Sequence, residues 1–182
     1  MRKRGKAAAP QALKLDLGCG PHKRDGFHGV DCRAFPGVDT VWDLATTPWP
    51  WADQSVTEVH TSHFVEHLTQ DQRIRFVNEL YRVLVPAGKA TVIVPHWASC
   101  RAYGDLTHQW PPVSEFWFYY LNKDWRAQNA PHNDAYTCDF ECTWGYSLRP
   151  DITVRSEEYQ SFAMQNYKEV AQDIISTWTK RR

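Results

Sequence analysis

Residues 13–31, LKLDLGCGPHKRDGFHGVD, contain the groups best suited to hold a nucleotide-like ligand. Gly18, Cys19 and Gly20 follow an alternating apolar segment, and glycine lets the backbone turn sharply and lets a ligand approach its amide groups. Asp31 ends the next short apolar run, where nucleotide-binding α/β folds place a carboxylate that accepts hydrogen bonds from ribose hydroxyls. We predict that the glycine loop and this acid form one pocket, with a plain tight turn as the alternative.

Three histidines could exchange a proton with a substrate near neutral pH, because imidazole titrates there. They are His63, His96 and His108, of which we predict His63 and His96 as catalytic. Each could equally be a hydrogen-bonded loop residue. Glu66 likewise has two possible roles. It could act in the chemistry, or it could only stabilise the start of a helix through the helix dipole.

The elements expected to position these residues alternate along the first half of the chain. Hydrophobic patterns predict strands at 13–17, around Val30, at 38–43, at 55–61 and at 89–95. Thr69 and Gln72 form a capping box ahead of a helical apolar repeat, so a helix is expected over 69–84, ended by Pro86 and Gly88. This order is typical of an open, mostly parallel α/β sheet.

The second half reads differently. Residues 96–135 are rich in aromatic side chains and are expected to form a lid or substrate region, with Ser114 able to cap a short helix. Strict alternation over 140–148 predicts a long strand, the one expected to be antiparallel. A final helix is predicted from Ser156, with an apolar stripe of Tyr159, Phe162, Asn166, Val170, Ile174 and Trp178.

Composition limits the class of protein. The 182 residues suit one domain, and no apolar run approaches the roughly 18 residues of a membrane span. The formal net charge is zero, so the chain lacks the overall positive charge typical of nucleic-acid-binding proteins. The basic residues at 1–10 and 180–182 are expected to be solvated tails, with a weak nucleic-acid contact as the alternative. Five cysteines in no regular framework indicate free thiols and a cytoplasmic location.

Several motifs occur together in order: LDLGCGP at 15–21, Asp31, WDL at 42–44, SHFVEHL at 62–68 and VLVPAGKATVIVP at 83–95. In this combination the chain resembles class I S-adenosylmethionine-dependent methyltransferases, of the group similar to those of ubiquinone and menaquinone biosynthesis. The resemblance covers residues 13–95. It implies a Rossmann-like fold with flanking helices, and methyl transfer that leaves S-adenosylhomocysteine.

The resemblance also implies roles by position. The first motif would hold the amino-acid end of the cofactor, Asp31 the ribose, the WDL segment the adenine, and the SHF loop the region beside the reacting methyl. The implied cofactor-binding residues are Asp16, Gly18, Cys19, Gly20, Asp31, Cys32, Asp43, Leu44, Ser62 and His63.

The acceptor is expected to be a small molecule methylated on oxygen, nitrogen or carbon. The segment GDLTHQWPPVSEF at 104–116 resembles a DPTH-like segment of small-molecule methyltransferases, which implies that Asp105 and His108 reach the acceptor. Trp97, Trp110 and Tyr119 would then wall it in, the alternative being that these aromatics only form the core of a lid. The chain departs from the family in two places: the connection over 20–28 is short for a crossover, and only one strand is expected after Pro95.

Three other functions compete with this one. A protein that binds S-adenosylmethionine without catalysis, or as a subunit of a larger assembly, would show the same motifs. A zinc protein could use His60, His63 and His67 with Cys138 and Cys142, but His60 lies on an expected strand, so no metal site is predicted. A nicotinamide-dependent oxidoreductase is disfavoured because the third glycine of the dinucleotide motif is missing. Oligomeric state does not follow from the sequence.

Overall fold

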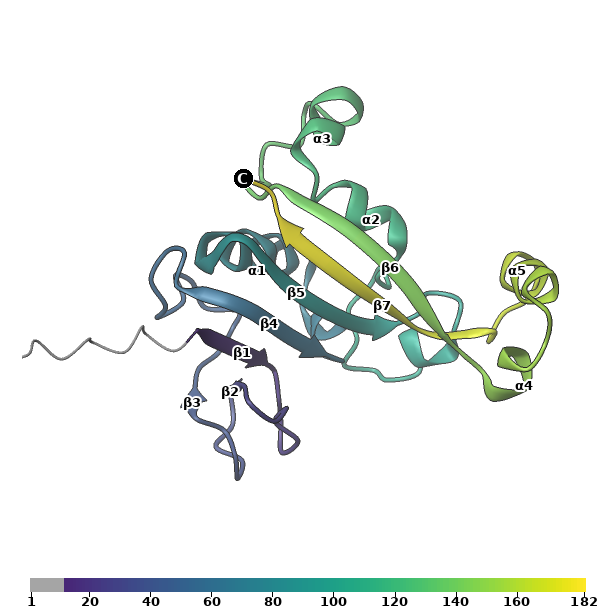
Figure 1. Ribbon diagram of the computed structural model, residues 1–182, viewed down its shortest axis with the longest axis horizontal. Coiled ribbons are helices and arrows are strands. Elements are labelled where there is room, and N and C mark those ends of the chain that lie inside the picture. The colour runs from purple at the N-terminus through teal and green to yellow at the C-terminus, as the bar shows by residue number, and fades with distance from the viewer. Residues whose placement is uncertain (1–11) are drawn as a thin grey trace, which may run out of the picture.

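A seven-stranded sheet forms the centre of the computed structural model, which describes residues 12–182 (Figure 1). The strand order is β3-β2-β1-β4-β5-β7-β6; the first five strands in that order are parallel, and β7 runs antiparallel to both of its neighbours. The expected open, mostly parallel sheet with one antiparallel strand near the C-terminus is therefore confirmed. The antiparallel strand is the one at 171–180, however, and not the expected one at 140–148, which runs parallel to the first five strands. The strands are β1 (Leu13–Leu17), β2 (His28–Asp31), β3 (Thr40–Val41), β4 (Val56–Ser62), β5 (Leu84–Pro95), β6 (Phe140–Leu148) and β7 (Ala171–Lys180).

Helices join the later strands. They are the 3₁₀ turns η1 (Val65–His67) and η2 (Cys100–Ala102) and the helices α1 (Gln70–Val83), α2 (Glu115–Tyr119), α3 (Lys123–Asn129), α4 (Pro150–Thr153) and α5 (Glu157–Asn166). Among residues 12–182, no helix has the length and apolar character needed to cross a membrane. The basic segment 1–10 lies outside the described residues. The solvated tail expected at 180–182 is wrong at Lys180, which ends β7, is buried and donates to the carbonyls of Tyr81 and Leu84.

The capping box that predicted α1 is present. The Thr69 hydroxyl accepts the Gln72 backbone N–H at 3.4 Å, and the Gln72 side chain accepts the Thr69 N–H at 2.8 Å. The helix ends at Val83, within one residue of the expected end ahead of Pro86 and Gly88. The strand expected from residue 89 instead begins at Leu84, so β5 contains both residues. The pairing of β5 with β4 is irregular there, which accommodates them in a bulge.

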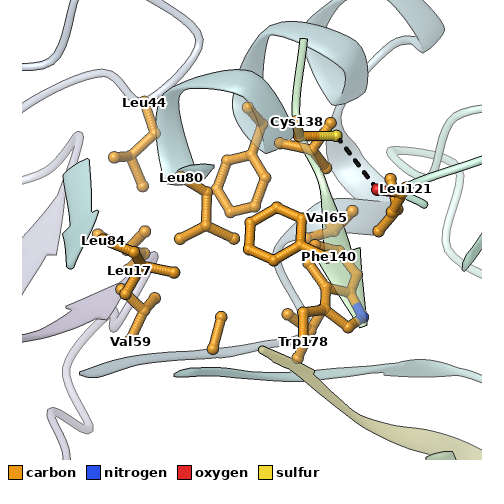
Figure 2. Close-up of a cluster of buried hydrophobic side chains, with 14 of the residues drawn as sticks. Leu17, Leu44, Val59, Val65, Leu80, Leu84, Leu121, Cys138, Phe140 and Trp178 are labelled. Carbon is orange, nitrogen blue, oxygen red and sulfur yellow. Dashed lines mark hydrogen bonds between the residues drawn. The ribbon is translucent and has the colours of Figure 1, made fainter. Parts of the chain in front are cut away.

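One face of the sheet is apolar and packs against α1 and the α2 region. Figure 2 shows Leu80 of α1 facing Leu17 and Leu84 of the sheet, with Phe140 and Trp178 continuing the same cluster. The other face is polar: Lys14 pairs with Glu58, and Asp16 with His60. Strands with one buried face alternate apolar and polar residues in sequence. This alternation is why the sequence predicted β1 as a half-buried strand.

The predicted final helix is wrong beyond residue 166. α5 covers Glu157–Asn166, and residues 171–180 form β7 instead. The expected stripe of Val170, Ile174 and Trp178 has a spacing of four, which satisfies the period of a strand as well as that of a helix. The β-branched residues between 174 and 179 favour the strand. Two strands therefore follow β5, not one.

The short connection between β1 and β2 is confirmed as abbreviated. Residues 18–27 are turns and irregular backbone without a helix. In Figure 1, α4 and α5 lie at one end of the molecule, beyond the ends of β6 and β7. Ser114 is the N-cap of α2, but its side chain makes no capping hydrogen bond.

Candidate functional site

The sequence-predicted cofactor residues collect at one edge of the sheet. β1 is flanked by β2 on one side and β4 on the other, so the chain order reverses there. In open α/β sheets a ligand binds at such a reversal, outside the carboxyl ends of the strands. The glycine loop, Asp31 and Ser62 follow or end these three strands, so the fold brings them to one edge.

The glycine loop and the acid of β2 are joined directly. The Gly20 amide donates a 2.9 Å hydrogen bond to Oδ2 of Asp31, and the amides of Gly18 and Cys19 both bond to the Val30 carbonyl. Gly20 has a φ of +53°, and the space beside its α-carbon is open, with no atom within 4 Å of where a Cβ would lie. A ligand can therefore approach the backbone at Gly20, next to the carboxylate.

Gly18 serves a different purpose. It also has a positive φ, of +67°, but a Cβ there would lie 2.6 Å from the ring of Phe64. The close approach permitted by this glycine is to the protein's own aromatic side chain. Of the two loop glycines, only Gly20 leaves room for a ligand.

Asp16 lies beneath the loop and is buried. Its Oδ2 accepts the Arg24 backbone N–H at 2.7 Å, and its Oδ1 lies 2.8 Å from Nδ1 of His60 on β4. Both carboxylate oxygens thus bond to the protein itself. The residue fixes the loop to the sheet.

The two cysteines of the predicted cofactor site flank the loop and the acid. Burial, with the nearby carboxylates of Asp16 and Asp31, raises the pKa of the Cys19 thiol. Burial and Asp31 likewise raise the pKa of Cys32, which is exposed. Both side chains are therefore neutral thiols at physiological pH.

The WDL segment divides between core and surface. Leu44 is buried in the core beside α1, as Figure 2 shows, so its side chain does not face solvent. Asp43 is exposed and its Oδ1 accepts the Ala45 N–H at 2.9 Å. Of this pair, Asp43 is the side chain available to a ligand.

His63 follows β4 with a φ of +54° and lies between two carboxylates. Its Nδ1 is 3.2 Å from Oε1 of Glu66, and its Nε2 is 3.7 Å from Oδ1 of Asp173. The hydrogen bond to Glu66 raises the pKa of His63, against the opposing effect of burial. Its Nε2 has no partner within hydrogen-bond distance, so this nitrogen can meet a substrate.

His96 follows β5 and is buried, with both ring nitrogens engaged. Nδ1 accepts the Ala98 N–H at 3.1 Å, so Nε2 carries the proton and faces Oε1 of Glu115 at 3.3 Å. Burial raises the pKa of Glu115, but bonds from His96 and Tyr146 outweigh it and the pKa lies below its ordinary value. Of the two predicted catalytic histidines, His63 is the one with a free ring nitrogen.

A hollow of about 910 Å³ opens beside His96. Trp97 and Tyr119, two of the predicted substrate residues, line it together with Trp144 and Tyr146. Trp110 lies in a neighbouring hollow of about 510 Å³, which Trp97 shares. The structure thus brings three of the five predicted substrate residues to adjoining surfaces.

The other two predicted substrate residues lie elsewhere. The His108 ring packs edge-on against that of His67, with centroids 4.7 Å apart, and Asp105 lies beside it. Glu115, Tyr146 and Asp173 are site residues that the sequence did not indicate. A helix over 171–180 does not predict a position for Asp173 at the site, whereas the alternation of β6 does place Tyr146 on a strand face.

The histidines and cysteines of the alternative zinc site are not brought together. His60 bonds to Asp16, and Cys138 is buried with its thiol directed at the Leu121 carbonyl, as Figure 2 shows. Burial raises the pKa of Cys138 to about 12, so the thiolate that zinc requires is disfavoured there. That combination of ligands is ruled out within residues 12–182.

Comparisons with known proteins identify the fold. No family model and no curated protein matches the sequence. Among solved structures, a SAM-dependent methyltransferase from Archaeoglobus fulgidus superposes with a TM-score of 0.66 at 19% identity, over 93% of this chain and 86% of that one. A SAM-dependent methyltransferase from Methanosarcina mazei gives a TM-score of 0.55 at 13% identity, over 96% and 95%.

A third similar structure contains ligands. Geranyl diphosphate C-methyltransferase from Streptomyces coelicolor A3(2), in complex with Mg²⁺, geranyl-S-thiolodiphosphate and S-adenosyl-L-homocysteine, gives a TM-score of 0.50 at 15% identity. The match covers 95% of this chain and 71% of that one. The strand order and the antiparallel β7 are thus shared with Rossmann-like, class I methyltransferases.

Proposed function

Since the chain has the fold of class I methyltransferases, we propose that it transfers a methyl group from S-adenosylmethionine to an oxygen, nitrogen or carbon atom of a small acceptor. The observation that carries the proposal is the hydrogen bond from Gly20 to Asp31 at the point where the strand order reverses. It places a carboxylate beside a glycine turn whose backbone at Gly20 is open to a ligand, as an adenosyl ligand requires.

The residues present fit this cofactor. Gly20 leaves open the space that a side chain would fill, and each oxygen of Asp31 retains a lone pair for a ribose hydroxyl after accepting its backbone bond. Asp43 and Ser62 follow or end neighbouring strands and extend the site. Asp16 positions the loop from below.

When bound, S-adenosylmethionine supplies an electrophilic methyl group on its own leaving group, so the protein has to orient the acceptor and exclude water. Glu66 holds Nδ1 of His63 and leaves Nε2, which lies 3.7 Å from Oδ1 of Asp173, able to hold a proton from the acceptor. Trp97, Tyr119 and Tyr146 supply the apolar walls of the hollow beside β5. His63 does not line this hollow, so we propose that the body of the acceptor binds there while its reacting atom extends to Nε2 of His63.

An aromatic lining favours a small acceptor with an apolar body. Trp97 and Tyr119 are about half exposed, at 49% and 42%, so they offer ring faces to a ligand. The geranyl diphosphate enzyme provides a precedent among the similar structures for a small acceptor with an apolar chain, which in that enzyme carries a charged diphosphate. We further propose a cytoplasmic location, supported by five cysteines that are all free thiols.

Calorimetric titration of S-adenosylmethionine tests the proposal. Asp31→Asn keeps an oxygen for the Gly20 amide but removes the charge, and we expect cofactor affinity to fall about 10- to 100-fold. Asp39→Asn is the matched control, because Asp39 also accepts a glycine amide, that of Gly29 at 2.7 Å, but precedes β3. Equal affinity in the two variants would contradict the ribose assignment.

Turnover distinguishes an enzyme from a binding protein. Wild-type protein, S-adenosylmethionine and a panel of small alcohols, amines and carbon acids should yield S-adenosylhomocysteine with at least one acceptor. His63→Ala should then lower kcat while leaving cofactor affinity nearly unchanged. Tight cofactor binding without turnover across the panel would favour the non-catalytic alternative.

A further inference from the structure

Three side chains of the types that bind metal ions meet next to His63. Glu66 and His67 come from η1, after β4, and His108 comes from the loop after η2. Each contributes one ligand atom, and these atoms lie within 4.8 Å of one another. The sequence separates His108 from the pair by some forty residues, so this cluster is created by the fold.

The carboxylate of Glu66 has an oxygen without a partner. Glu66 is 3% exposed; its Oε1 lies 3.2 Å from His63, but its Oε2 is buried with no hydrogen-bond donor. A buried carboxylate oxygen without a donor is costly and uncommon in proteins. A cation at Oε2 would remove that penalty.

Hydrogen bonds fix which nitrogen each histidine presents. Nδ1 of His108 donates to the Ala102 carbonyl at 3.1 Å, which leaves the lone pair on Nε2. The Thr107 hydroxyl donates to Asp105 at 2.8 Å, so it accepts from Nδ1 of His67, 3.0 Å away. Both rings therefore offer Nε2, each held by an outer hydrogen bond, as metal-binding histidines usually are.

The two segments that carry the ligands are fastened together. The Gln109 amide donates to the Glu66 carbonyl at 2.8 Å. The buried guanidinium of Arg73 bonds to the carbonyls of Val65, Glu66, Gln109 and Pro111. η1 and the loop at 105–111 are thus held in one arrangement without help from the cluster.

We propose that Glu66, His67 and His108 bind a divalent transition-metal ion, with Zn²⁺ as the best match. Two imidazoles and one carboxylate form a common zinc ligand set with an open fourth position. Tetrahedral Zn²⁺ with bonds of about 2.1 Å needs its ligand atoms about 3.4 Å apart, so the side chains close in by up to about 1.4 Å on binding. Asp105, with Oδ2 at 3.9 Å from Nε2 of His108, is a further carboxylate next to this cluster.

This site is separate from the proposed cofactor pocket but adjoins it through Glu66. The metal would take Oε2, whereas Oε1 holds His63. Binding would cross-link the segment after β4 to the loop after β5. The inference concerns metal affinity alone, and its test requires neither cofactor nor acceptor.

The experiment uses full-length protein stripped with a chelator and titrated with Zn²⁺, and separately with Co²⁺, whose visible absorption reports tetrahedral coordination. We expect one equivalent of tightly bound metal in the wild type. His67→Ala, His108→Ala and Glu66→Gln should each weaken binding by more than about 100-fold, because each removes a ligand. His132→Ala, which removes an exposed histidine from the loop after α3, should bind like the wild type.

Thr107→Val provides a variant that leaves all three ligands in place. It removes the acceptor for His67, together with the bond from the hydroxyl to Asp105, and we expect metal affinity to fall about 10- to 100-fold with an unchanged circular dichroism spectrum. The proposal is overturned if the wild type fails to bind Zn²⁺ below about 100 μM. Equal affinity in wild type, His67→Ala and His108→Ala would also overturn it, because the metal would then bind elsewhere.

Discussion

His60 and Asp16 are register partners on the adjacent parallel strands β4 and β1, and their side chains form a 2.8 Å hydrogen bond on the polar face of the sheet. Asp16 is 3% exposed, and its other oxygen holds the Arg24 amide. The pair therefore links the glycine loop to the strand on the opposite side of the reversal in strand order. It takes over part of the support that a crossover helix would give this loop.

Removing His60 should destabilise the protein measurably. His60→Ala leaves a buried carboxylate oxygen without its partner, for which we expect a loss of about 2 kcal/mol in the free energy of unfolding in urea. Glu58→Ala is the control on the same strand and face. Glu58 pairs with Lys14 in the open, both side chains being about 40% exposed, so its loss should stay under about 1 kcal/mol. Similar losses in the two variants would refute the structural role given to the buried pair.

The two loop glycines should respond differently to alanine. Both have positive φ values, so each substitution carries a similar backbone strain of about 1 kcal/mol. Gly18→Ala also drives a Cβ to within 2.6 Å of Phe64, and we expect a further loss of about 1–3 kcal/mol in unfolding free energy. Gly20→Ala should instead weaken S-adenosylmethionine binding more than stability. Adding Phe64→Ala to Gly18→Ala should recover part of the unfolding free energy lost to the clash. If the double variant recovered none, the predicted clash between the new Cβ and the Phe64 ring would be contradicted.

The sequence predicted the pairing of the glycine loop with Asp31 because both features are local and follow strands with clear alternation. It predicted α1 from a complete capping box. It failed at 171–180, where a spacing of four fits helix and strand alike and where pairing with β5 and β6 decides the outcome. Local patterns do not contain that long-range pairing.

Contacts between segments far apart in the chain could likewise not be predicted from the sequence. Phe64 fills the space above Gly18, and the Glu115 carboxylate pairs with Nε2 of His96. Neither contact can be predicted from the spacing of residues in the sequence. The meeting of His67 with His108 is of the same kind. Residue types thus indicated the chemistry of the site, while the fold decides which of those residues meet.

Acid should weaken the attachment of the loop at 49–53 to α1. Glu79 accepts the Trp49 amide and two bonds from Arg82, which also binds Asp53. Burial raises the pKa of Glu79, but these bonds outweigh it and the folded-state pKa lies below the unfolded value of 4.5. The stabilisation is therefore complete above about pH 4.5 and is lost as the pH falls toward the lower, folded-state pKa.

Glu79→Gln isolates this contribution. It should lower the free energy of unfolding by about 1–3 kcal/mol at pH 7 and reduce the slope of stability against pH below 4.5. Denaturant titrations at several pH values between 3 and 7 measure both effects. Asp71→Asn changes an exposed acid of α1 and should leave the slope close to that of the wild type. If the stability of wild type and Glu79→Gln fell with pH at the same slope, Glu79 would be excluded as the source of the acid sensitivity.

Arg73→Lys tests whether the buried guanidinium organises the junction between η1 and the loop at 105–111. Arg73 reaches four carbonyls through three nitrogens, and burial lowers its pKa. A lysine ammonium has three donors at one point and cannot span the same carbonyls, so some are left without a partner. We expect a loss of about 2–4 kcal/mol in unfolding free energy and weaker Co²⁺ binding, because Glu66 and His108 are no longer held in register. Arg75→Lys changes an exposed position of the same helix and should leave the unfolding free energy and the Co²⁺ affinity within error of the wild type. If Arg73→Lys also left both unchanged, the junction would not depend on the guanidinium.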